Sequence, residues 1–117
     1  NTPLQALALM NEVTYVEAAR GLAEKMLSLE SAKNTEARLI LGYRLATGSS
    51  PNAGTLSILI DGLNKRRKLF SENPDGAKSL INQGSSTPQS GLDEVELAAY
   101  TSTANILLNL DRVIMKN

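Results

Sequence analysis

Two asparagines stand out because they lie in the most apolar helix-forming segment of the chain. Asn105 and Asn109 are four residues apart, so they share one face of a helix. An unpaired buried amide costs about 1–3 kcal/mol. The pair therefore either binds a ligand in a helical cleft or satisfies backbone groups of a neighbouring helix end or loop. We favour the second interpretation, with residues 1–11 as the segment held, and Asn109→Leu should then lower the melting temperature.

Asp111 follows in the same segment, close to the expected end of the helix. The helix dipole disfavours an acidic side chain at that end, so an arginine partner explains Asp111 better than catalysis does. The candidate partners are Arg112 and, from other helices, Arg20, Arg38 and Arg44. An alternative is that the chain completes an active site formed by other domains, with Arg44, Asn105, Asn109 or Asp111 at the seam.

The run of four basic residues is Lys65, Arg66, Arg67 and Lys68. Consecutive helical residues point about 100° apart, so these side chains ring the helix and do not form one stripe. Asp61 lies four residues before Lys65, a spacing that suits a surface ion pair. No aromatic residues interleave the run to stack on bases. We interpret it as a solvated helix face, with a basic patch for an acidic partner or nucleic acid as the alternative.

The composition excludes several classes of chemistry. Histidine and cysteine are absent from the chain, which rules out disulfides, thiolate or imidazole metal sites and Ser-His-Asp or Cys-His catalysis within it. Its 12 basic and 12 acidic residues balance, which gives no long-range attraction to nucleic acid. No carboxylate pair is placed for general acid–base work. We expect no cofactor, no metal, no nucleic-acid partner and no membrane span.

The elements that position these residues are expected to be helices throughout. Leucine and alanine number 19 and 13, against 6 isoleucines and 4 valines, and the first two are the better helix formers. Apolar residues recur at steps of three and four, and the helices are expected to start near residues 3, 12, 35, 51, 74 and 93. The expected N-caps are Thr2, Asn11 or Thr14, Asn34 or Thr35, Ser50, Asn73 and Asp93.

The predicted fold is an all-α, single-domain antiparallel bundle of five to six helices over residues 1–117. The spacing also assigns core faces to the helices. The second helix should bury Tyr15, Ala18, Ala19, Leu22, Met26 and Leu29, and the third Leu41 and Leu45 with Ala37 and either Arg38 or Tyr43. The helix that starts near 51 should bury Leu56, Leu59, Ile60, Leu63 and Phe70, and the last helix should be mostly buried through Leu97, Ala98, Tyr100, Ala104, Leu107, Leu108, Leu110, Val113 and Ile114. Residues 84–91 are expected to form an exposed loop. The segment 4–10 is apolar nearly all round, so we expect it to leave a docking patch if the domain does not cover it.

Two long motifs resemble a known family. The opening NTPLQALALMNEVTYVEAARGLAEKM (residues 1–26) and the closing AAYTSTANILLNLDR (98–112) are similar to the Planctomycete-specific domain family. The layout between them is also similar: Tyr43-Arg44-Leu45 precedes a turn, and a leucine-rich helix ends at Phe70. The chain departs from the family at Tyr100, where a tryptophan is usual, and at Arg112, where an acid is usual.

The resemblance implies what kind of larger protein contains this chain, but it implies no activity for the chain itself. Such segments are the C-terminal part of large, exported planctomycete proteins, many of which carry a cytochrome-c-like domain upstream. The family brings no catalytic residues to assign. The chain also opens at Asn1 without an initiator methionine, as a fragment would. We therefore expect a non-catalytic packing or interaction module whose partner is the rest of its own polypeptide, and self-association stays open.

Overall fold

A computed structural model describes residues 13–84 and 86–116 of the chain, with side chains from 16 to 110 apart from residue 85. All regular structure in that part of the chain is helical, which confirms the all-α prediction. The first expected helix lies outside the described residues. The helices are α2 (Val13–Ser28), α3 (Thr35–Thr47), α4 (Ala53–Ser71), α5 (Pro74–Ile81) and α6 (Glu94–Lys116).

Polar side chains set most of the helix starts, as the sequence predicts. The Asn34 side chain accepts a hydrogen bond from Ala37 N at 2.7 Å, and Asn73 caps α5 with Pro74 behind it. Asp93 caps α6 by accepting from Glu96 N at 2.9 Å. At the other end of α3, Gly48 takes the left-handed backbone conformation with φ 79°.

Three helix boundaries differ from the prediction. α4 is capped by Asn52 and not by Ser50, because the Asn52 amide oxygen reaches Thr55 N at 2.8 Å. Thr14 lies inside α2 and does not cap it. α5 ends at Ile81, three residues before Gly84, where the expected loop begins.

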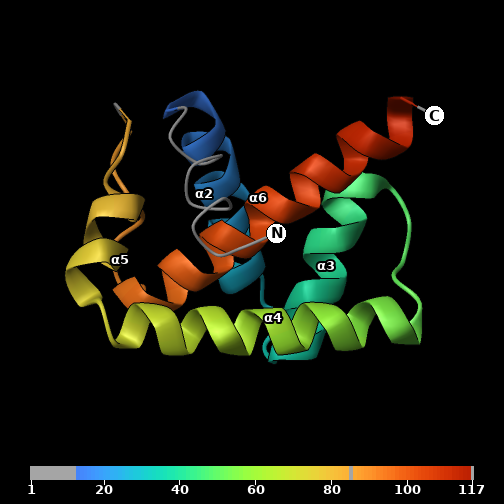
Figure 1. Cartoon of the computed structure of the whole chain (residues 1–117), viewed down its shortest axis with the longest axis horizontal. Coiled ribbons are helices and arrows are strands. Elements are labelled where there is room, and N and C mark those ends of the chain that lie inside the picture. The colour runs from blue at the N-terminus through green and yellow to red at the C-terminus, as the bar shows by residue number, and fades with distance from the viewer. Residues whose placement is uncertain (1–12, 85, 117) are drawn as a thin grey trace.

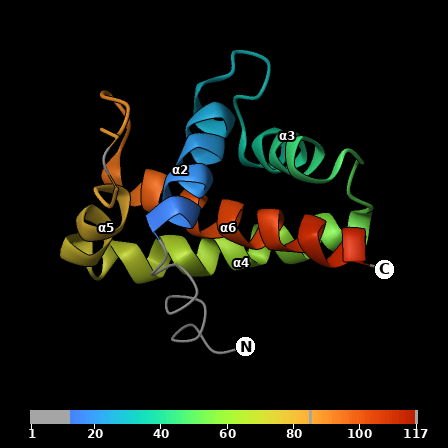
Figure 2. The same cartoon turned by 90° about the horizontal axis from the view of Figure 1, so that it is seen from above.

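Helix α6 runs through the middle of the molecule. It packs against each of the other four described helices, and most closely against α2. Figure 1 shows α4 running along one side of α6, with α2 and α3 standing steeply to α4. In Figure 2, seen from above, the paths of α4 and α6 overlap, and α2 and α3 lie together to one side of α6. Helix α3 also packs against α4. The radius of gyration is 13.2 Å, in line with the roughly 13 Å of a folded domain of about 100 residues.

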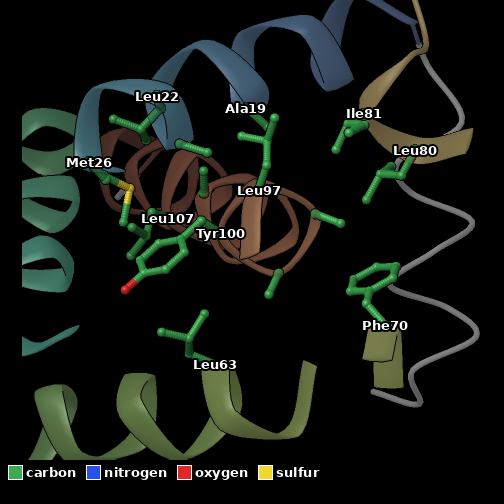
Figure 3. Packing of buried hydrophobic residues seen from close by; sticks show 14 of the residues in the cluster. Ala19, Leu22, Met26, Leu63, Phe70, Leu80, Ile81, Leu97, Tyr100 and Leu107 are labelled. Carbon is green, nitrogen blue, oxygen red and sulfur yellow. The ribbon is translucent and has the colours of Figure 1, made fainter. Parts of the chain in front are cut away.

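The core is built around the side chains of α6. Tyr100, Leu97 and Leu107 are fully buried, as the sequence predicts. They point toward Leu63 of α4 on one side and toward α2 on the other, as Figure 3 shows. The buried apolar residues contributed by the other helices are Val16, Ala19, Leu22, Ala23, Met26, Leu39, Leu59, Leu63, Phe70, Ala77, Leu80 and Ile81.

The predicted core face of α3 is wrong. Leu45 is 53% exposed and Leu41 is only half-buried, whereas Leu39 is fully buried. The helix is turned so that Gly42 comes against α2: a β-carbon there would lie 2.6 Å from Met26 Cε. A side chain at 42 would have to displace the thioether end of Met26, so glycine allows this face of α3 to approach α2 closely.

The predicted stripe of α2 is correct at its centre and wrong at its margins. Ala19, Leu22 and Met26 are buried, but Ala18 is exposed and Leu29 lies beyond the helix end. The buried face also includes Val16, Arg20 and Ala23, so it is displaced from the predicted stripe. No helix in the described part of the chain is both long and apolar enough to span a bilayer.

Candidate functional site

The side chains of the four basic residues of α4 point to different sides of the helix, as their spacing predicts. Lys65 and Lys68 are exposed, and Lys65 pairs with Asp61 at 3.4 Å, which confirms the expected ion pair. Arg66 turns inward and donates to the Thr103 hydroxyl at 3.3 Å. Burial lowers the pKa of Arg66 below its ordinary value. The run therefore presents two of its four charges to solvent.

Arg67 joins three helices. Its guanidinium donates to both Glu96 oxygens of α6, at 2.8 and 2.9 Å, and to the Thr35 hydroxyl of α3 at 3.1 Å. It also lies over the Tyr100 ring, 5.6 Å from the ring centre. The hydrogen bond that Arg67 donates to Glu96 raises the pKa of Arg67, and burial opposes this more weakly. Arg67 thus fixes the start of α3 against α4 and α6.

The asparagine pair lies inside the fold. Asn105 is 3% exposed, and Asn109, which is half-buried, donates to the Asn105 carbonyl at 2.9 Å. Asn109 therefore satisfies a backbone group of its own helix. In the described part of the chain, the Oδ1 atom of Asn105 and the Oγ1 atom of Thr101 are buried without a hydrogen-bond partner. The proposed hold on residues 1–11 falls outside the described residues.

The other two candidates do not join the asparagines. Arg44 is exposed on α3, while Asn105 is enclosed in α6. The side chain of Asp111 lies outside the described residues. Two of the arginines offered as its partners are engaged elsewhere: Arg38 donates to the Ala32 carbonyl at 3.2 Å, and Arg20 belongs to the network described next. The side chain of Arg112 also lies outside the described residues.

A buried arginine that the sequence did not single out for a role of its own holds the connection between α5 and α6. Arg20 is 3% exposed and donates to the carbonyls of Ile81, Gln83 and Ser86 at 2.7, 3.1 and 3.0 Å. It also contacts the Ser86 hydroxyl and lies 3.8 Å from Glu24. The sequence feature that could have indicated this role is an arginine within the apolar stripe of α2, four residues before a glutamate.

Two carboxylates of α2 complete this attachment. Glu17 accepts from the backbone and hydroxyl of Ser86, at 3.0 and 2.8 Å. Glu24 accepts from Gln89 N at 2.7 Å, and the Gln89 side chain donates to Ser28 at 3.0 Å. These groups bind protein backbone and lie along one side of α2. Their arrangement is that of a structural clamp, since the arginine's donors are directed to main-chain acceptors.

A groove of about 510 Å³ lies between the start of α3 and the first half of α4. We call it the α3–α4 groove. It is open to solvent, and Ile58 at its edge is 73% exposed. Leu56 and Ile60 line it as half-buried side chains. Its remaining lining residues are Glu36, Ala53, Ser57, Asp61 and Asn64.

The side chains at these sites make hydrogen bonds, ion pairs and apolar contacts. No group of three or more acidic side chains within the described residues is placed to hold a metal ion. No family model matches the chain, and neither a curated protein nor a solved structure is significantly similar to it. Function has to be argued from the groove and from the side chains around it.

Proposed function

We propose that this domain is a non-catalytic interaction module that docks onto another part of a larger polypeptide through the α3–α4 groove. The observation that carries the proposal is Ile58, an isoleucine left 73% exposed among the lining residues of a groove that Leu56 and Ile60 line from another face of α4. Isolated exposed apolar residues are ordinary on a protein surface. An exposed isoleucine at the edge of a partly apolar groove is a feature of contact sites.

The wider context of the proposal comes from the opening and closing motifs. Their similarity to the Planctomycete-specific domain family supports a parent protein that is exported, redox-associated and of planctomycete origin. In such a protein, the domain would contribute a folded surface, and electron transfer would belong to upstream domains. The absence of histidine and cysteine from the chain is in keeping with that division.

A role in completing an enzyme's active site is the alternative, and the positions of the candidate residues favour it less. It needs Arg44, Asn105, Asn109 or Asp111 at a seam with another domain, and the side chain of Asp111 lies outside the described residues. Arg44 is exposed on α3, Asn105 is buried in α6, and neither lines the α3–α4 groove.

Hydroxyl-radical footprinting of the full-length parent protein and of this chain alone tests the docking proposal. Oxidation of Ile58 should fall markedly in the full-length protein because a partner segment covers it. Leu69, an exposed leucine near the other end of α4, is the internal control and should react equally in both. Equal oxidation of Ile58 in the two proteins would remove the docking role from this groove.

A further inference from the structure

The polar residues of the α3–α4 groove carry charge of one sign. Glu36 and Asp61 are its charged lining residues, and both side chains are exposed. Arg67 lies close by through its bond to Thr35, but Glu96 already compensates its charge. The nearest opposing charge is Lys65, whose pair with Asp61 joins two side chains that are 78% and 72% exposed. Such a pair contributes about 0–1 kcal/mol, so a partner's cation can replace it.

The length of the groove suits a helical segment. Its lining on α4 extends from Ala53 to Asn64. At 1.5 Å per residue this is roughly 16 Å, or about three helical turns. An amphipathic helix laid in a groove presents apolar anchors at i, i+3 or i+4 and i+7 over a similar distance. Leu56 and Ile60, four residues apart on one face of α4, line the groove as half-buried side chains, and the exposed Ile58 lies at a different angle around the helix, three residues from Asp61. These are the apolar surfaces that such anchors would contact, with the two carboxylates nearby.

We propose that the α3–α4 groove binds a basic amphipathic helix, with lysine or arginine side chains beside its apolar face. The inference rests on the proposed function and adds the chemistry of the partner. The apolar contact supplies most of the affinity. Glu36 and Asp61 select a cationic segment and disfavour an acidic one, since electrostatic complementarity contributes mainly to specificity.

Two designed peptides of about four helical turns provide the probe. Both carry the same leucine face, and one has lysines where the other has glutamates. In isothermal titration calorimetry at low ionic strength, the lysine peptide should bind about tenfold more tightly, which corresponds to two surface charge pairs. The difference should shrink as salt is added. The variant Glu36→Lys/Asp61→Lys should reverse the preference.

Matched variants locate the binding. Ile58→Asp should abolish binding of the lysine peptide, while Leu69→Asp, an exposed leucine of the same helix outside the groove, should leave it unchanged. Glu72→Lys reverses the charge of an exposed acid that does not line the groove and should preserve the preference. Circular dichroism of each variant checks that the helices are retained.

Three results would overturn the inference. Equal affinity for the two peptides would remove the charge selection, and full binding by Ile58→Asp would place the contact elsewhere. A dimer detected by light scattering and lost in Ile58→Asp would assign the groove to a second copy of the chain. The footprinting experiment can still succeed in the first case, so failure of the charge selection is distinguishable from failure of docking itself.

Discussion

Individual arginines play different parts depending on what surrounds them. Arg67 comes from a run that suggests a basic surface, yet it bridges Glu96, Thr35 and Tyr100 inside the fold. Arg20 comes from an apolar stripe and is almost completely buried against main-chain carbonyls. A planar guanidinium with several donors suits both positions, and a lysine ammonium would suit neither. Arg20 and Arg67 therefore hold elements of the fold together and do not form a basic surface.

The Arg20 contacts lead to a prediction at the residue scale. Arg20→Met should lower the free energy of unfolding by about 2–4 kcal/mol, because it leaves buried carbonyls without their donor. Urea unfolding followed by circular dichroism measures the change. Arg44→Met, which alters an exposed arginine of α3, is the matched control and should shift stability by less than about 0.5 kcal/mol. A similar small loss for Arg20→Met would show that the clamp contributes little.

One glycine in α2 and one in α3 have different surroundings. Gly42 of α3 faces the buried Met26 of α2, with Leu107 of α6 next to it. A β-carbon on Gly21 of α2 would have no atom within 4 Å apart from its two chain neighbours and the backbone of its own helix. One glycine is therefore needed for packing, and the other only lowers helix propensity.

Opposite effects are expected when each glycine is replaced. Gly21→Ala should raise the free energy of unfolding by about 0.5–1 kcal/mol, because alanine is the better helix former and meets no obstacle. Gly42→Val should lower it by about 1–3 kcal/mol, because the added atoms overfill the contact with Met26. Thermal or urea denaturation reports both. A stable Gly42→Val variant would mean that α3 can move away from α2 at little cost.

At the scale of the whole molecule, α6 connects all the other described helices. Because α2, α3, α4 and α5 all pack on it, none of them can lose its main contact without exposing part of the α6 core. The clamp on α2 and the Arg67 bridge add polar links between elements that are distant in sequence. This arrangement favours unfolding as one cooperative unit.

We expect a single unfolding transition in urea. Far-ultraviolet circular dichroism follows the helices, while tyrosine fluorescence, free of tryptophan in this chain, reports on buried Tyr100 among the tyrosines. The two curves should share one midpoint, as two-state unfolding requires. Loss of helical signal before the fluorescence change would instead show that a peripheral helix such as α5 unfolds separately from the core.

The groove was not predictable, and particular residues show why. Leu56, Leu59 and Ile60 all fit the helical period of α4, but only Leu59 is fully covered, and Ile58 falls off that period. Whether such a leucine or isoleucine becomes core or groove wall depends on where α3 stops covering α4. That position is set by the contacts of Thr35 and Gly42 with residues far along the chain.

The sequence by itself determined that the described chain is helical and where most of its helices begin, because capping and apolar periodicity act within a few residues. It also determined the burial of Tyr100 and Leu107 and the pairing of Asp61 with Lys65. Only the tertiary structure decided the rotation of α3 and the partners of Arg20 and Arg67. These depend on packing between different helices, and local propensity carries no information about which faces will meet.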